Sequence, residues 1–112
     1  MSHTPGHANF SPQQIVCLES PQERLYGSVI QFIEKQKSYW IRPHCLVSSE
    51  SEAAEVISLH RTSDVIIDYQ RVREALDTEI LEFWTALYDE SLGYEDNVSG
   101  RAILHRFLRN FF

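Results

Sequence analysis

The spacing of apolar residues changes once along this chain, close to Tyr69, and that change limits the folds it can adopt. From Leu25 to Asp68 the apolar residues alternate with polar ones or form short runs, which is typical of β-strands. After Tyr69 they recur at steps of three and four residues, which is typical of an amphipathic helix. Strands followed by helices in one chain predict the α+β class.

Four strands are expected in the first half, over residues 24–34, 38–47, 55–61 and 64–68. Residues 35–37 would connect the first pair, and a turn at 61–63 would connect the second pair. The first strand is apolar on both faces, so we expect a small, strongly curled antiparallel sheet of four or five strands that could approach a barrel. Gly27 indicates a bulge or a corner where the sheet bends, and Pro43 requires an edge or a bulge because it donates no hydrogen bond.

Two C-terminal helices should follow the sheet. The first covers residues 77–88, with Asp77 or Thr78 as its N-cap, and the second begins after Asn97 or Ser99. The predicted core consists of large apolar residues from both halves: Val29, Ile30, Phe32, Trp40, Ile41, Leu46, Ile57, Leu59, Ile66, Ile80, Phe83, Trp84 and Leu87.

The chain of 112 residues is long enough for one domain. Residues 1–22 are rich in Ser, Pro, His and Gln, and we expect them to form a flexible polar arm. An apolar island at 15–18 could add an edge strand. Residues 23–112 should form a single α+β domain.

Charge is distributed unevenly around a formal net charge of −6. Eight acidic residues and no Lys or Arg lie between Glu74 and Asp96, whereas the last fourteen residues hold Arg101, Arg106, Arg109 and no acid. An acidic body is poorly suited to a phosphate backbone, whose affinity comes mainly from cations. It suits a basic partner surface or simply solubility.

Cys17 and Cys45 are the two cysteines, and they lack the spacing of a disulfide framework or a CxxC motif. The N-terminus lacks the charged and apolar regions of a secretory signal. No stretch approaches the ~18 apolar residues of a membrane span. These features predict a soluble cytoplasmic protein, and no cofactor is predicted.

One alternative is a small metal- or cysteine-dependent enzyme. His44, Cys45 and His60 have side chains that zinc prefers, but neighbours on a strand point to opposite faces. Cys45 and His60 could also form a nucleophile–base pair oriented by Asp64 or Asp68. Catalytic carboxylates could come from Glu34, Asp64 and Asp68, although acids at strand ends are usually turn or cap groups.

A second alternative is a small barrel that binds single-stranded nucleic acid. The hairpin mixes cations and aromatics, namely Lys35, Lys37, Tyr39, Trp40 and Arg42. Such surfaces bind by stacking and charge, but cross-strand packing also accounts for the aromatic residues. Nucleic acid is therefore a minor expectation.

The last helix is the main candidate for binding. Its predicted partner-binding residues form an apolar face with flanking arginines: Ile103, Leu104, Phe107, Leu108, Phe111, Phe112, Arg106 and Arg109. This face could dock on a partner groove or a membrane surface, or it could pack on its own sheet. The leading hypothesis is a non-catalytic protein-binding or assembly-accessory module, possible as a dimer, that uses this helix and a sheet edge.

About half of the chain resembles a group of short uncharacterised cyanobacterial proteins. The resemblance rests on Leu25-Tyr-Gly-Ser-Val-Ile-Gln through Trp40-Ile-Arg-Pro, followed by Arg73-Glu-Ala-Leu-Asp-Thr-Glu-Ile-Leu. It implies the cytosol of a photosynthetic bacterium, and it implies no enzyme class.

Overall fold

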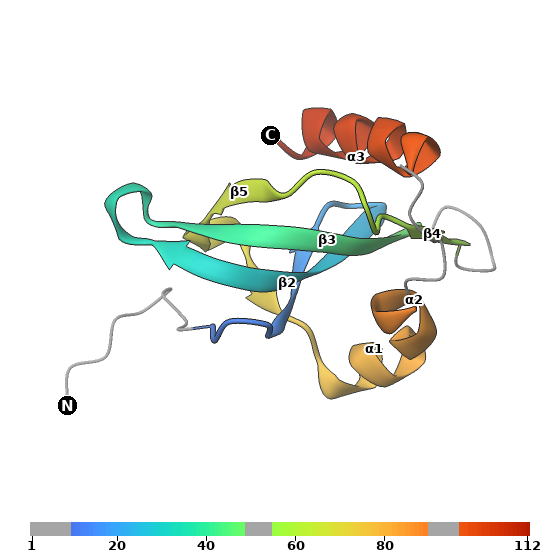
Figure 1. The fold of residues 1–112 in the computed structure, drawn as a ribbon, viewed down its shortest axis with the longest axis horizontal. Coiled ribbons are helices and arrows are strands. Elements are labelled where there is room, and N and C mark those ends of the chain that lie inside the picture. The colour runs from blue at the N-terminus through green and yellow to red at the C-terminus, as the bar shows by residue number, and fades with distance from the viewer. Residues whose placement is uncertain (1–9, 49–54, 90–96) are drawn as a thin grey trace.

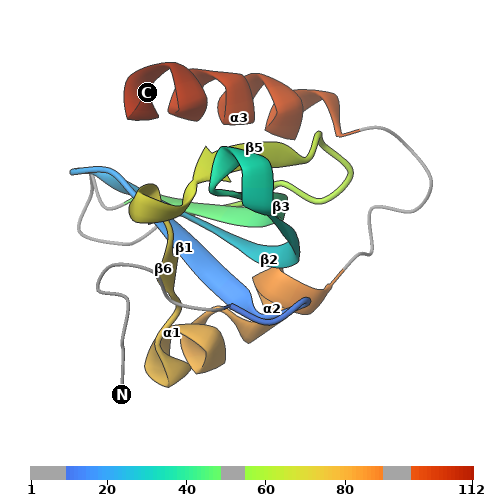
Figure 2. The ribbon, with the colours of Figure 1, turned by 90° about the vertical axis from the view of Figure 1, so that its left-hand side faces the viewer.

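The computed structural model describes residues 10–48, 55–89 and 97–112, and its sheet lies between two helical layers (Figures 1 and 2). Every strand pair is antiparallel, and the class is α+β, as predicted from the change in apolar spacing. The six strands are β1 (Ile15–Glu19), β2 (Glu23–Ile33), β3 (Ser38–Ser48), β4 (Glu55–Ser58), β5 (Val65–Asp68) and β6 (Arg73–Glu74). Short 3₁₀ turns follow β2 (η1, Glu34–Gln36) and β5 (η2, Tyr69–Arg71).

The sheet runs in the order β4-β3-β2-β1-β6, and β5 also pairs with β3. Residues 55–68 were expected to form a hairpin, but this prediction is wrong. β4 pairs with one end of β3, where Leu46 faces Ile57, and β5 pairs with the other end, where Tyr39 faces Ile67. β4 and β5 therefore act as one edge strand interrupted by the segment 59–64.

The interruption of this edge lies beside a bulge in the sheet. The register between β2 and β3 shifts at Tyr26 and Gly27, and Gly27 faces Pro43. A Cβ atom on Gly27 would lie 2.6 Å from the Arg42 carbonyl oxygen, so only glycine fits there. Pro43 has no strand partner on its other side. The bulge predicted at Gly27 is confirmed, and it explains how proline is accommodated inside a long strand.

The sheet is open and not strongly curled, unlike the barrel-like sheet expected from the sequence (Figure 2). The reason lies in the two apolar faces of its strands. Each face is covered by helices, so both are buried without closure of the sheet. On β2, for example, Leu25 packs toward one helical layer and Tyr26 toward the other.

Two hydrophobic cores result, one on each face of the sheet. The core beneath the last helix contains Val16, Leu18, Leu25, Val29, Tyr39, Ile41, Leu46, Leu59, Val65, Ile67, Val72, Leu104, Phe107 and Phe111. The opposite core is smaller and contains Ile15, Cys17, Tyr26, Cys45, Val47, Ala75, Phe83 and Leu87.

β1 falls inside the segment expected to be a flexible arm. It lies between β2 and β6, and Val16, Cys17 and Leu18 are fully buried. Its alternating side chains contribute to both cores, so it belongs to the interior of the sheet and not to an edge. Residues 1–9 of the expected arm lie outside the described part of the chain.

The predicted helix over 77–88 is two helices, α1 (Asp77–Glu82) and α2 (Trp84–Tyr88), which break at Phe83. The last helix is α3 (Val98–Phe111), and the Asn97 side chain caps it by accepting from the Gly100 amide at 2.9 Å. α1 and α2 cover one face of the sheet, and α3 covers the other (Figure 2). Among the helices described, none is long and apolar enough to cross a bilayer.

Two members of the predicted core are exposed. Trp84 is 54% exposed because the break at Phe83 turns Phe83 and Leu87 inward and leaves Trp84 on the outer face. Ile66 is 44% exposed because Val65 and Ile67, its neighbours in β5, take the inward positions. Val29, Ile41, Leu46, Leu59, Phe83 and Leu87 are buried as predicted, while Ile30, Phe32, Trp40, Ile57 and Ile80 are partly buried.

Candidate functional site

An exposed apolar surface lies on the outer side of α1 and α2. It consists of Leu81, Trp84 and Tyr88, which are 72%, 54% and 49% exposed, and we call it the Trp84 surface. The Trp84 and Tyr88 rings lie one helical turn apart, with centroids separated by 4.5 Å. Aromatic residues grouped in this way on a solvent-facing helix are typical of binding surfaces.

Acidic residues lie on the same two helices as the Trp84 surface. Asp77, Glu82 and Asp89 are exposed on the same two helices or at their ends. The sequence contains no Lys or Arg from Glu74 to Gly100. The two helices therefore carry exposed apolar side chains and exposed carboxylates together.

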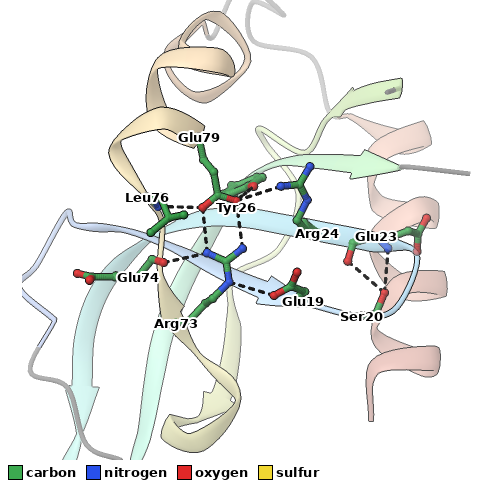
Figure 3. Close-up of polar contacts among 9 residues, drawn as sticks. All are labelled: Glu19, Ser20, Glu23, Arg24, Tyr26, Arg73, Glu74, Leu76 and Glu79. Atoms are coloured by element: carbon green, nitrogen blue, oxygen red, sulfur yellow. Dashed lines mark hydrogen bonds and ion pairs between the residues drawn. The ribbon is translucent and has the colours of Figure 1, made fainter. Parts of the chain in front are cut away.

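A single buried carboxylate fixes these helices to the sheet (Figure 3). Glu79 of α1 is 7% exposed. Its carboxylate oxygens accept hydrogen bonds from both terminal nitrogens of Arg73, with N···O distances of 2.9 and 3.1 Å. It also accepts from Arg24 at 3.1 Å, from the Tyr26 hydroxyl, and from the Leu76 amide at 2.8 Å. The contact to Leu76 satisfies a free amide at the start of α1, as a capping box does.

The pKa values in this cluster follow from those contacts. Hydrogen bonds from Arg73 hold the pKa of Glu79 down at about 2, against the opposing effect of burial. Burial and the bond to Glu79 raise the pKa of Tyr26, and the bond to Glu79 raises the pKa of Arg73. Each group is held in its ordinary charge state near pH 7, so the cluster is suited to fixing structure and not to exchanging protons.

Two histidines meet between β3 and α2. His44 Nδ1 lies 3.3 Å from His60 Nδ1, and their ring centroids are 4.9 Å apart. The other ring nitrogens also have partners: His44 Nε2 lies 2.9 Å from Ser28 Oγ, and His60 Nε2 lies 2.8 Å from the Ala86 carbonyl oxygen. His60 is 3% exposed, and His44 is half-buried.

The position of Cys45 does not suit a nucleophile. Cys45 is fully buried in the core beneath α1 and α2, and burial raises the pKa of its thiol to about 12. Among the described residues, no group of three or more His, Cys, Asp or Glu could hold a metal ion.

The three candidate carboxylates have separate partners. Glu34 pairs with Lys37 at 2.7 Å, and the Asp68 side chain accepts from the Gln70 amide. Asp64 accepts from Trp40 Nε1 at 3.0 Å. Each one has a local structural role, as expected for acids at strand ends and turns.

Most of the hairpin residues proposed to bind nucleic acid already have partners within the chain. Tyr39 is 1% exposed and packs between the rings of Phe10 and Phe32, so it cannot stack on a base. Arg42 forms an ion pair with Asp64 at 3.3 Å, and Lys37 pairs with Glu34. Lys35 is exposed. A single strand would meet no row of stacking aromatics on this face.

The apolar face of α3 packs largely on the chain's own sheet. Leu104, Phe107 and Phe111 are buried there, and Ile103 and Leu108 are partly buried against the same core. Of the residues predicted to bind a partner, Phe112 is 73% exposed and Arg109 is exposed. These two line a hollow of about 380 Å³ with His105 and Leu108.

Polar contacts hold α3 at three points along its length. At its start, the Asn97 side chain donates to the carbonyl oxygens of Ser58 and His60. In its middle, Arg106 forms a two-point ion pair with Glu23, at 2.7 and 3.2 Å. At its end, Arg71 donates to the Phe111 carbonyl oxygen and lies 3.8 Å from the centre of the Phe111 ring.

Sequence reasoning missed the Trp84 surface because it placed Trp84 in the core. A signal was present: Leu81, Trp84 and Tyr88 repeat the spacing of Ile80, Phe83 and Leu87 one position later. Two neighbouring apolar stripes on a short helix indicate that it is apolar on more than the buried face.

Comparison of the chain with protein-family models, with curated proteins and with solved structures gives no match. The candidate function therefore depends on the chemistry of the surfaces described above.

Proposed function

We propose that this chain is a non-catalytic protein-binding module and that its docking surface is the Trp84 surface. The observation that carries the proposal is the exposure of three large apolar residues on one side of two short helices that are fixed from below. Binding hot spots are enriched in Trp and Tyr because these rings bury a large area at a small cost in side-chain entropy.

The partner we propose is a basic amphipathic segment, such as a helix with apolar residues on one side and Lys or Arg on the other. Its apolar side would cover Trp84 and Tyr88, and its cations would face Asp77, Glu82 and Asp89. Opposite charges around an apolar centre increase the rate at which two partners associate, and they fix the orientation of the bound partner. An acidic partner would be repelled by the same groups.

The Glu79 cluster supports this role because it makes the surface rigid before binding. Arg73 and Arg24 come from two strands, and both donate to the same carboxylate of α1. A surface that is already ordered loses less conformational entropy when a partner arrives.

We propose a second protein-binding surface at the end of α3. It involves fewer residues than the sequence predicted, because most of the apolar face of α3 is buried on the sheet. α3 lies on the opposite side of the sheet from α1 and α2 (Figure 2), and its exposed residues include Arg109 and the adjoining Phe112. We also propose that two copies of the chain associate through this end of α3. The sequence alone supports a bacterial cytoplasmic location, which we include in the proposal.

The test uses two synthetic peptides of equal length, one an amphipathic helix of Leu and Lys and the other with Glu in place of every Lys. The chain has two tryptophans, so each indole N–H gives its own NMR signal. We expect the basic peptide to shift the Trp84 signal and leave the Trp40 signal in place, because Trp40 is bonded to Asp64 on another part of the sheet. Added salt should weaken the binding.

Two exposed aromatic residues provide matched variants. Trp84→Ala should weaken peptide binding at least about tenfold, and Phe112→Ala should leave it unchanged. The reverse result, with binding lost only in Phe112→Ala, would assign the function to α3 and overturn the Trp84 surface. Equal binding of the acidic peptide would overturn the basic partner. Light scattering of the same variants reports whether either surface joins two copies.

A further inference from the structure

We propose that a hollow at the interrupted edge of the sheet binds the phosphate group of a small phosphomonoester. The hollow has a volume of about 240 Å³ and is lined by Arg42, Pro43, Arg61, Thr62 and Asp64. Pockets for drug-sized ligands are larger, at about 300–1,000 Å³, so this hollow suits a small anion. The inference is independent of the proposed protein-binding function.

The hollow exists because the edge strand stops and restarts at this point. β5 pairs with β3 as far as Ile41, and β4 pairs with β3 from Cys45 onward. Between these positions β3 has no edge strand beside it, and the connection from β4 to β5 arches away from it (Figure 1). Pro43 lies in this gap and has no N–H group that would need a strand partner.

The charge of the hollow is opposite to that of the whole chain. Its lining contains two guanidinium groups and one carboxylate, whereas the chain has a formal net charge of −6. Arg42 comes from β3, and Arg61 and Asp64 come from the connection between β4 and β5. A local excess of positive charge attracts anions, and the guanidinium fork matches the oxygens of phosphate.

Arg42 uses only one edge of its guanidinium group within the chain. Its Nε lies 3.3 Å from Asp64 Oδ1, and its Nη2 lies 3.4 Å from Asp64 Oδ2. Guanidinium has five N–H donors, and these contacts use two of them. The other three, on Nη1 and Nη2, form no hydrogen bond with a described residue. They lie along the outer end of the group, where a phosphate can accept from both nitrogens at once.

Asp64 orients Arg42 and leaves it able to bind more strongly elsewhere. Hydrogen bonds between ions usually span about 2.7–2.9 Å, and both contacts between Arg42 and Asp64 are longer. The carboxylate is itself fixed by Trp40, whose Nε1 donates to Oδ2 at 3.0 Å. Because Asp64 repels an anion, the bound phosphate should contact the end of the guanidinium group that faces away from this carboxylate.

Arg61 supplies the second guanidinium group from an uncommon backbone conformation. Its φ angle is 64°, in the left-handed region that residues with a Cβ atom rarely adopt. The Thr62 hydroxyl donates to the Leu59 carbonyl oxygen at 2.6 Å within the same turn. Glycine would suit this backbone better than arginine, so the turn alone does not account for Arg61. Strained residues gather at binding sites, and here the side chain lines the hollow with Arg42.

Phosphate suits two guanidinium groups better than a carboxylate does. A phosphomonoester carries a charge of about −1.5 to −2 at pH 7 and has three oxygens that accept hydrogen bonds. A carboxylate has one charge and two oxygens, and a single guanidinium fork can occupy both oxygens. We therefore expect the phosphate group to contact Arg42 and Arg61 together.

The experiment follows the two indole N–H signals of the full chain by NMR at constant ionic strength. Inorganic phosphate, methyl phosphate and acetate are added in separate titrations. Trp40 donates to Asp64, which contacts Arg42, so its signal reports on the hollow. We expect both phosphates to shift the Trp40 signal to saturation, acetate to bind at least about tenfold more weakly, and the Trp84 signal to stay in place. The basic peptide should instead move Trp84, so the two proposals succeed or fail separately.

Three arginine variants test the lining of the hollow. Arg61→Gly removes one guanidinium group and suits the left-handed backbone, so it should weaken phosphate binding at least about tenfold in a folded chain. Arg42→Lys keeps the charge but removes the fork, and it should weaken binding several-fold. Arg109→Gln is the control, because Arg109 is exposed on α3, and it should leave binding unchanged. If Arg61→Gly unfolds, the comparison of Arg42→Lys with Arg109→Gln decides.

Several results would overturn the site. A Trp40 signal that stays in place throughout both phosphate titrations is one of them. Acetate binding as tight as phosphate binding would overturn the assignment of phosphate. An equal loss in Arg109→Gln and Arg42→Lys would show general attraction to cations. Binding of inorganic phosphate with rejection of methyl phosphate would overturn the phosphomonoester as the ligand class.

Discussion

At the scale of single residues, Glu79 is the side chain on which the position of α1 depends most. It receives hydrogen bonds from two arginines, a tyrosine hydroxyl and a backbone amide, and it is nearly inaccessible to water. In the sequence it is one of eight acids between Glu74 and Asp96, and nothing in its neighbours distinguishes it. Its role is set by Tyr26 and Arg24, more than fifty positions earlier, and is therefore visible only in the folded chain.

Replacing Glu79 by Gln should lower the free energy of unfolding by about 3 kcal/mol at pH 7, because two guanidinium groups lose their counter-charge. Urea unfolding of Glu79→Gln, with Glu82→Gln as the exposed control on the same helix, measures this effect. The pKa of Glu79 is lowered from 4.5 to about 2, so its contribution is complete above about pH 5 and disappears as the pH falls to about 2. Equal stability of both variants at pH 7 would show that the cluster contributes little.

At the scale of elements, the break between α1 and α2 decides which aromatic residue is buried. Phe83 is 6% exposed and lies 5.5 Å from the Tyr26 ring, while the adjacent Trp84 faces solvent. An unbroken helix of the same sequence would leave the choice between the two stripes open. The contacts of Phe83 with the sheet settle it.

Phe83→Ala should therefore cost about 3–5 kcal/mol of stability, and Trp84→Ala less than about 1 kcal/mol. Thermal unfolding of the two single variants compares two neighbouring aromatic-to-alanine substitutions. A larger loss in Trp84→Ala than in Phe83→Ala would reverse the assignment of the two faces. A small effect of Trp84→Ala also makes that variant a sound one for binding measurements.

The elements with strong local signals were predictable from the sequence. The strands over 24–34 and 38–47 lie within one residue of β2 and β3, and Asn97 caps α3. Local pattern did not show that β4 and β5 share one neighbour, because both pairings depend on β3, which lies earlier in the chain. The sequence also named His44 and His60, but the alternation of side chains along a strand could not account for the bulge at Pro43, which sets the direction of His44.

At the scale of the whole molecule, the sheet separates two cores that have no buried residue in common. Both cysteines belong to the smaller core beneath α1 and α2, and both are fully buried. Burial raises the pKa of the Cys17 and Cys45 thiols to about 12, so almost no thiolate is present near pH 8.

Both thiols should consequently resist alkylation in the folded protein and react at once in denaturant. Mass spectrometry of iodoacetamide labelling at pH 8 follows the two sites. We expect Glu79→Gln to increase the labelling rate at least about tenfold, because it loosens the helices that cover this core. Fast labelling of either cysteine in the unsubstituted chain would show that the smaller core is open to solvent.

The divided edge formed by β4 and β5 has a consequence for aggregation. A long, straight outer strand exposes a row of unpaired amides and carbonyls that can template the backbone of another molecule. Here that edge is offered in two pieces of four residues each, separated by a turn with Arg61 in a left-handed conformation. At the other border of the sheet, β6 has two residues, both charged. We therefore expect these short, interrupted borders to resist extension by a neighbouring chain into a continuous fibril.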